Sequence, residues 1–296
     1  MRWALIVLLV AAVFAIPDAA PCLAHGKPSA DISRGPDVVD TGDGADVSDS
    51  GSTTSDVAPT SPISDVSATD ISDIAAAGGA SDVGLAVLDL RTGVTVSSQG
   101  DKPFYSASLS KLILAVDAVR RPLSDGDVAL IDRALSVSDD NAMDVLWTRF
   151  DGMGAIGRVA TAAGLTGTHA PEDPSQWGEV VITANDMVRL YDYILNSSQL
   201  SSAQRDAVVG ALSKAPATAA DGFDQAFGLL GVTGVYAKQG WMYYLPADVY
   251  LHSAGVLDDR YAVAVLTTNP TGSWTTARDS INAVSTAVLA KLGVKG

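Results

Sequence analysis

The chain has 296 residues, of which 47% are hydrophobic and 6% aromatic, and its formal net charge is −15. The hydrophobic share predicts a globular part, and the negative charge disfavours nucleic acids and anionic membrane surfaces as partners. The single cysteine, Cys22, allows no intramolecular disulfide and no cysteine-based metal cluster. Three scattered histidines do not form a metal-binding pattern either, so we expect no metal site.

The N-terminus has the pattern of an export signal. After the positive Arg2 comes an apolar run that is shorter than the roughly 20 residues of a membrane span. Small residues before His25 predict cleavage there, so residues 1–24 are interpreted as a signal peptide and the protein as exported. The alternative is a lipid anchor on Cys22, which Pro21 directly before the cysteine disfavours.

Residues 25–73 differ in composition from the rest of the chain. They are rich in Asp, Ser, Thr, Gly and Ala and contain no Phe, Trp or Tyr. Such a segment buries too little apolar area to offset the entropy lost on ordering, which predicts a disordered acidic linker. Calcium binding is the alternative, but the closing Glu of a calcium-binding loop is missing. The folded domain is therefore predicted to cover residues 74–296.

The predicted elements of this domain are two strands, a helical middle, three strands and a final helix. Strands are predicted at residues 83–90, 94–97, 234–238, 249–253 and 261–267, and helices at 112–119, 183–195, 202–212 and 276–292. The late strands are joined by short connections and should therefore be antiparallel neighbours. The order predicts an α+β fold with an antiparallel sheet built from both chain ends and flanked by helices.

Ser108 and Lys111 form the first motif that carries chemistry, a Ser-x-x-Lys at the start of the predicted buried helix. Residues three apart share one face of a helix, so the serine hydroxyl and the lysine amine are expected to be neighbours. The helix N-terminus favours an alkoxide, and burial lowers the pKa of a lysine so that it can accept a proton. The alternative is a serine that only caps the helix and a lysine that extends into solvent.

Two further patterns follow, Ser138-Asp139-Asp140-Asn141 between helical segments and Lys238-Gln239-Gly240-Trp241 at a strand end. Together with Ser-x-x-Lys they resemble the S-x-x-K, S-D-N and K-T-G motifs of the serine β-lactamase and penicillin-binding-protein family. The resemblance covers roughly residues 74–293 and is greatest to class A β-lactamase-like serine hydrolases. It implies an exported enzyme that transfers acyl groups from a β-lactam or a wall-peptide amide of the D-Ala-D-Ala type.

The resemblance also implies roles for individual residues. Ser108 would be the acylated nucleophile, Lys111 its proton acceptor and Ser138 the proton donor to the leaving nitrogen. Lys238 would supply positive charge, and the backbone N–H groups of Ser108 and Trp241 would form the oxyanion hole. The remaining substrate-binding positions would be Asp140, Asn141, Gln239, Gly240 and Trp241. No cofactor is implied.

The chain departs from the family pattern at several positions. Asp140 occupies the slot of the substrate-binding Asn, and Asn141 follows one residue later as a possible substitute. Gln239 replaces a hydroxyl residue, and Asp248 falls near the place where an arginine commonly supports the substrate carboxylate. Only 30 residues separate Ser108 from Ser138, which predicts a reduced all-helical subdomain.

Glu172 is the candidate for the base that activates water in deacylation. Glu172 and Glu179 are the only glutamates, and both precede the helix that is predicted to start at Thr183. The family pairs this Glu with an amide four residues later, where Gln176 follows Glu172 here. An ordinary loop carboxylate is the alternative.

The competing function is a catalytically impaired protein of this fold that binds wall peptide or a protein partner. The altered positions near the substrate carboxylate favour the binding protein, whereas the four polar residues Ser108, Lys111, Ser138 and Lys238 favour the enzyme. The aromatic run from Trp241 to Tyr244 is interpreted either as packing or as a wall of the substrate cleft. The sequence does not predict an oligomeric state.

Overall fold

The computed structural model describes residues 63, 66–79, 81–270 and 272–294. The predicted signal peptide and nearly all of the predicted linker lie outside the described residues. Within these ranges, no helix combines the length and the hydropathy needed to cross a membrane.

Eight α-helices and two short 3-10 helices are described. The α-helices are α1 (Ala68–Ala76), α2 (Ser110–Ala118), α3 (Asp125–Ser136), α4 (Asp140–Arg149), α5 (Gly152–Ala163), α6 (Ala184–Asn196), α7 (Ser202–Leu212) and α8 (Trp274–Leu292), and the 3-10 helices are η2 (Ala107–Leu109) and η3 (Trp177–Glu179). The strands are β1 (Asp82–Asp89), β2 (Thr95–Ser98), β3 (Phe104–Tyr105), β4 (Val181–Ile182), β5 (Val235–Tyr244), β6 (Asp248–Leu257) and β7 (Tyr261–Asn269).

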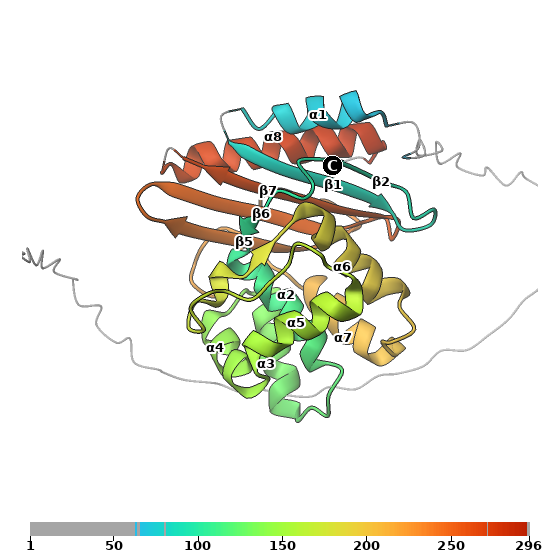
Figure 1. Cartoon of the computed structure of the whole chain (residues 1–296). Coiled ribbons are helices and arrows are strands. Elements are labelled where there is room, and N and C mark those ends of the chain that lie inside the picture. The colour runs from blue at the N-terminus through green and yellow to red at the C-terminus, as the bar shows by residue number, and fades with distance from the viewer. Residues whose placement is uncertain (1–62, 64–65, 80, 271, 295–296) are drawn as a thin grey trace, which may run out of the picture. The chain divides into compact units, whose positions relative to one another are not determined.

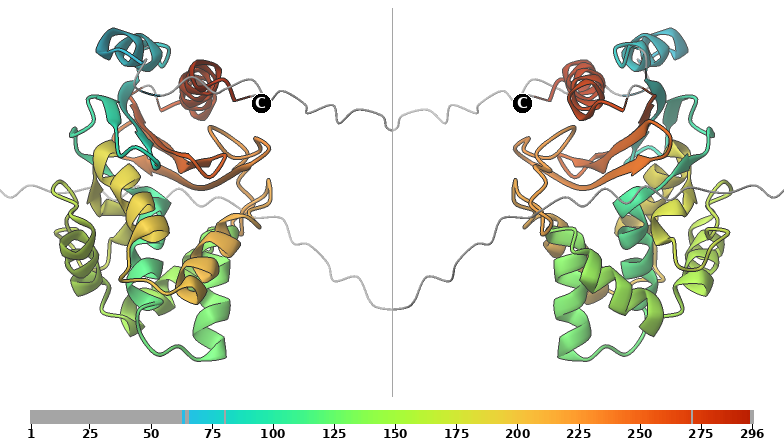
Figure 2. Two further views of the ribbon diagram at one scale, coloured as in Figure 1. Left: turned by 90° about the vertical axis from the view of Figure 1, so that its right-hand side faces the viewer. Right: turned by 90° about the vertical axis from the view of Figure 1, so that its left-hand side faces the viewer.

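Five strands form one antiparallel sheet in the order β2-β1-β7-β6-β5. Helices α1 and α8 cover one face, and the helical part α2–α7 lies against the other (Figures 1 and 2). The first two strands come from the N-terminal end of the domain and the other three from its C-terminal end. This confirms the predicted α+β fold and its sheet built from both ends of the chain.

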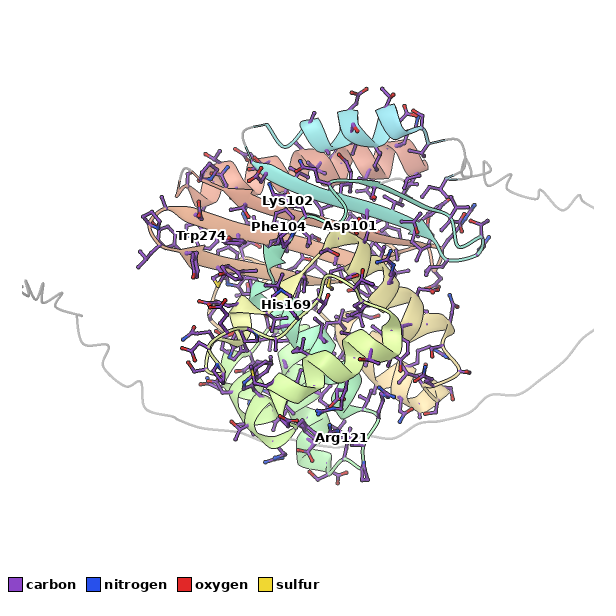
Figure 3. All side chains as sticks on the ribbon, in the orientation of Figure 1. Asp101, Lys102, Phe104, Arg121, His169 and Trp274 are labelled. Atoms are coloured by element: carbon purple, nitrogen blue, oxygen red, sulfur yellow. The ribbon has the colours of Figure 1, made fainter. Side chains whose placement is uncertain are left out.

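The sheet separates two apolar cores. In β7 the side chains alternate, so that Leu266 packs with the helical part while Val265 packs with the layer of α1 and α8. Both residues are fully buried, which explains why the strand is apolar at consecutive positions. Phe104, at the junction between the sheet and the helical part, leads the chain through β3 into η2 (Figure 3).

The folded part begins earlier than the predicted boundary at residue 74. Helix α1 starts within the predicted linker and crosses the boundary, and Ser67 caps it by accepting a hydrogen bond from the Asp70 backbone N–H at 3.1 Å. Ile63 and Val66 are buried in the core on the α8 side, at 1% and 9% exposure. The prediction missed this helix because its buried Ile71 and Ala75 follow a long polar segment whose composition indicated a linker.

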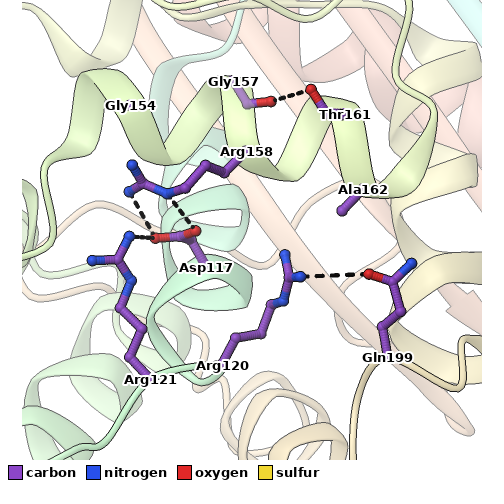
Figure 4. A pocket seen from close by; sticks show the side chains of 9 residues that line it. All are labelled: Asp117, Arg120, Arg121, Gly154, Gly157, Arg158, Thr161, Ala162 and Gln199. Carbon is purple, nitrogen blue, oxygen red and sulfur yellow. Dashed lines mark hydrogen bonds and ion pairs between the residues drawn. The ribbon is translucent and has the colours of Figure 1, made fainter.

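Salt bridges fix helix α2 to α5 (Figure 4). The buried Asp117 carboxylate accepts two hydrogen bonds from Arg158, both at 3.0 Å, and pairs with Arg121 at 2.8 Å. These groups line an open groove of about 1010 Å³, where Arg120 donates only a long hydrogen bond of 3.4 Å to Gln199. The Asp117 contacts tie the C-terminal end of α2 to its neighbour and so hold in place the helix that begins next to Ser108.

Candidate active site

Ser108 and Lys111 meet as the sequence predicts. Ser108 lies in η2, and Lys111 lies in the first turn of α2. Helix α2 follows η2 directly in the chain. The Lys111 Nζ donates to Ser108 Oγ at 2.7 Å, and the two residues are 1% and 5% exposed. Ala107 adopts a left-handed φ of 45°, which is uncommon for a residue with a side chain and reorients the backbone just before the serine.

Ser138 lies in the tight connection between α3 and α4. The Asp139 side chain caps α4 by accepting from the Ala142 backbone N–H at 3.2 Å. This cap fixes the backbone of Asp139 and thereby the positions of its neighbours Ser138 and Asp140. Ser138 has a left-handed φ of 56°. Both of its oxygens face Lys111, whose Nζ lies 3.0 Å from the Ser138 carbonyl oxygen and 3.3 Å from Oγ.

Lys238 reaches the same hydroxyl from the sheet. Its Nζ donates to Ser138 Oγ at 2.8 Å, so Ser138 lies between two lysines. Its strand, β5, is an edge strand of the sheet and packs against η2. Gly240 permits this close approach, because a Cβ there would lie 2.9 Å from the Ser106 carbonyl oxygen. The three sequence motifs therefore converge on one site.

Asp140, and not Asn141, occupies the slot beside Lys111. Asp140 Oδ1 accepts from Lys111 Nζ at 2.6 Å, although the carboxylate is 62% exposed. Asn141 is exposed, is absent from the pocket lining and has no hydrogen bond to the motif residues described here. These observations give no support to the expectation that Asn141 binds substrate, and Asp140 is the residue of this motif that contacts Lys111.

The two lysines are tuned by burial and by nearby charges. Burial lowers the pKa of Lys111, and the carboxylates of Asp140 and Asp221 oppose that shift. Burial also holds the pKa of Lys238 well below its usual range, and the Lys111 ammonium lowers it further. A lysine with a lowered pKa can act as a base toward the hydroxyl that it contacts.

A pocket of about 260 Å³ opens above Ser108. Among its lining residues are Asp140, Gln176, Trp177, Trp241 and Met242. The Lys111 Nζ lies 4.6 Å from the centre of the Trp177 ring, and the Lys238 Nζ lies 5.6 Å from that of Trp241. Two tryptophans thus line the pocket, and the interpretation of Trp241 as a cleft wall agrees with this geometry.

Each tryptophan is held by an aspartate that the sequence did not single out. The Trp177 indole N–H donates to Asp144 at 2.8 Å, and that of Trp241 donates to Asp221 at 3.0 Å. Trp241 also stacks on Phe223 with ring centres 5.0 Å apart. Helical spacing could have indicated Asp144, which follows Asp140 by one turn, but no local pattern identifies Asp221.

Gln239 does not face the pocket, contrary to the expectation that it binds substrate. Its side chain is 1% exposed, and its amide donates to the Phe227 carbonyl oxygen. Its Oε1 accepts from Ser253 Oγ at 2.9 Å. Successive strand residues point to opposite faces, so the residue after Lys238 enters the core instead.

Asp248 lies far from the third motif, so its expected effect on a substrate carboxylate was also wrong. Residue 248 is opposite Tyr244, whereas Ser253 is opposite Gln239. Five residues of a strand span roughly 17 Å. The sequence placed Asp248 wrongly because β5 and β6 extend further than their apolar segments.

The loop before α6 does not bring Glu172 into the pocket. Glu172 is exposed, and neither it nor Glu179 is among the residues that line the pocket. Gln176 does line it, so the loop contributes an amide to the site without the carboxylate. The structure therefore gives no support for Glu172 as the deacylating base.

His252 is a packed residue next to the site. Its ring is fully buried, with Nε2 2.8 Å from the Tyr105 carbonyl oxygen, and its Nδ1 accepts from the Thr267 backbone N–H at 3.2 Å. These contacts link β6 to β3, the strand that leads into η2. Within the described ranges, no group of three or more His, Cys, Asp or Glu residues is placed to hold a metal ion.

The sequence matches the Beta-lactamase enzyme family over residues 67–133 and 127–292. A protein of Mycobacterium tuberculosis named "Putative lipoprotein LppW" is 33% identical over 226 residues, which cover 72% of this chain and 71% of the relative. The Mycobacterium bovis protein of the same name matches equally well.

Solved β-lactamases share the fold. The enzyme from Sphaerobacter thermophilus is 18% identical with a TM-score of 0.61, over 78% of this chain and all of that one. A class A β-lactamase from Mycobacterium abscessus is 17% identical with a TM-score of 0.61, over 76% of this chain and all of that one. The converging motifs, the family match and the shared fold together show that this chain belongs to the β-lactamase enzyme family.

Proposed function

We propose that this protein is a serine hydrolase that forms an acyl-enzyme at Ser108. The observation that carries the proposal is the 2.7 Å contact between Lys111 Nζ and Ser108 Oγ inside a pocket that is open to a ligand. A nucleophile and a base within hydrogen-bond reach, with the base held by further groups, are the required parts of such a reaction.

The acylation step follows from these contacts. Lys111 takes the proton of Ser108 while the Oγ–C bond forms, and the backbone N–H groups of Ser108 and Trp241 stabilise the oxyanion. The C–N bond of the β-lactam or peptide amide then breaks. The leaving nitrogen takes the proton of Ser138, which lies between Lys111 and Lys238 and regains a proton from Lys111.

Deacylation is the weak step of the proposed reaction. Asp140 is the only carboxylate that lines the described pocket, and it is bound to Lys111. Without a second carboxylate to activate water, the acyl-enzyme persists, and β-lactams are turned over slowly. A wall-peptide amide of the D-Ala-D-Ala type is the alternative acyl donor.

The Asp140–Lys111 ion pair supports a second candidate function. A carboxylate 2.6 Å from the lysine stabilises its ammonium form, which cannot take the serine proton. If this ion pair dominates, the protein binds a wall peptide or a protein partner in its pocket without acylation. Covalent labelling separates the two functions.

We propose that the protein is exported to the cell envelope. The pattern of residues 1–24 supports export, and the relatives' name supports a lipid anchor, contrary to the expectation that Cys22 is not lipidated. Expression in a bacterium that processes lipoproteins tests the anchor. A lipidated protein is recovered in the membrane fraction, and Cys22→Ala releases it.

The mass of the intact protein after incubation with a fluorophosphonate or with benzylpenicillin tests the acylation. We expect one adduct per chain from each reagent, mapped to the peptide that contains Ser108, and none in Ser108→Ala. Absence of both adducts from a folded protein would contradict the enzyme and favour the binding function.

A further inference from the structure

We propose that the leaving-group side of this pocket selects acyl donors that carry a neutral or cationic group there, and rejects those that carry a carboxylate. The specificity-determining residue is Asp221. This inference rests on the acyl-transfer function proposed above and names the substrate class for it.

The leaving-group side is defined by Ser138 and Lys238. Ser138 is the proton donor to the leaving group, and Lys238 contacts it from β5 at 2.8 Å. The Lys238 Nζ lies over the Trp241 ring, and the N–H of that ring donates to Asp221. Asp221 is therefore placed behind the aromatic wall on the side where the leaving group departs.

Among the described residues, the site holds negative charge and offers no free cation that suits a carboxylate. The carboxylate of Asp140 pairs with Lys111 at 2.6 Å, and the exposed carboxylate of Asp221 accepts the indole N–H of Trp241 at 3.0 Å. No arginine lines the pocket in the described part of the chain. An incoming carboxylate would meet a buried Lys238 that already donates to Ser138 Oγ and to the Gln239 carbonyl oxygen, and would find no bidentate partner.

The walls also fit this class of ligand. Trp177 and Trp241 line the same pocket, and their indole N–H groups are both bound to aspartates. A ring fixed in this way offers its π face, which attracts cations and flat apolar groups. Asp144 adds a further exposed negative charge next to Trp177. The pocket thus combines aromatic walls with an acidic rim.

Three matched acyl donors test the inference: benzylpenicillin, its methyl ester and its 2-aminoethyl ester. They share one acyl group and differ in the charge and the size of the group on the leaving side. The rate of adduct formation is measured by intact mass at low ionic strength. We expect the methyl ester to react about tenfold faster than the acid and the cationic ester at least as fast as the methyl ester. High salt should reduce the difference, because Asp221 is exposed.

Asp221→Asn is the decisive variant, because asparagine can still accept the Trp241 hydrogen bond. We expect it to remove most of the preference for the ester. The matched control is Asp224→Asn in the same loop, where the carboxylate pairs with Arg278 instead of with a tryptophan that lines the pocket. This control should keep the wild-type preference.

A fluorophosphonate separates this inference from the proposed function. If the fluorophosphonate labels Ser108 but the acid reacts as fast as the methyl ester, the substrate class is wrong and the acyl-transfer function stands. The same conclusion holds if Asp221→Asn keeps the preference. If no reagent labels Ser108, the proposed function itself fails.

Discussion

The protonation state of Lys111 decides whether Ser108 reacts. Burial lowers the pKa of this lysine, and Asp140 is the largest opposing influence. Only the neutral amine takes the serine proton, so acylation is expected to rise with pH through the pKa of Lys111. The carboxylate that fills the Asn slot therefore limits the rate at lower pH.

Asp140→Asn should speed acylation at low pH. Removing the carboxylate removes an influence that raises the pKa of Lys111, so the neutral amine becomes available at lower pH. We expect the acid limb of the fluorophosphonate labelling rate to move to lower pH, with a several-fold faster rate on that limb. Asp132→Asn, at an exposed ion pair with Lys214, is the control. An unchanged profile would show that Asp140 does not set the state of Lys111.

His252 should make the fold sensitive to mild acid. Burial lowers its pKa from 6.5 to about 4, so between these pH values the unfolded chain binds a proton that the folded chain does not. Stability is therefore full above pH 6.5 and falls as the pH drops towards 4, by roughly 3 kcal/mol. Urea unfolding at pH 7 and pH 4.5 measures this loss. His252→Gln should reduce the difference, whereas His169→Gln, at an exposed histidine, should keep it.

At the scale of elements, the N-terminal helix is part of the fold. Ile63 and Val66 are buried, and Ser67 forms a capping box with Asp70. A chain that starts at Ala68 loses these contacts, and we expect its free energy of unfolding to fall by roughly 3 kcal/mol or more. A chain that starts at Val57 keeps them and should unfold like the full mature chain. Equal stability of the two shortened chains would show that residues 57–67 contribute nothing.

The elements that local pattern determines were predicted well. The helix predicted at 202–212 matches α7, and Thr183 caps α6 by accepting from the Asp186 N–H as its spacing indicates. The late strands pair antiparallel but extend beyond their predicted ends. Strand length depends on partners across the sheet, so apolar runs show only the buried part of each strand.

At the scale of the whole molecule, sequence could identify the reacting groups but not everything around them. Ser108, Lys111, Ser138 and Lys238 carry motif patterns, and the fold brings them together. Asp221 belongs to no sequence motif. Its hydrogen bond with Trp241 depends on how the loop before β5 folds back onto that strand.

The sequence also did not predict the direction in which some side chains point. The core position of Gln239 depends on Ser253 in β6 and on Phe227 in the loop before β5, two partners that only the folded chain brings together. Glu172 has the expected position in sequence, but its loop turns it to solvent. Tertiary contacts, which no local spacing encodes, decide both cases.

A pre-steady-state burst tests the central claim most directly. Hydrolysis of a neutral p-nitrophenyl ester should release about one p-nitrophenol per chain rapidly, because acylation of Ser108 precedes slow deacylation. Ser108→Ala should abolish the burst, and Lys111→Ala should slow it by roughly 10²–10⁴-fold. A burst that persists in Ser108→Ala, or no p-nitrophenol release from the folded wild-type protein, would contradict the account.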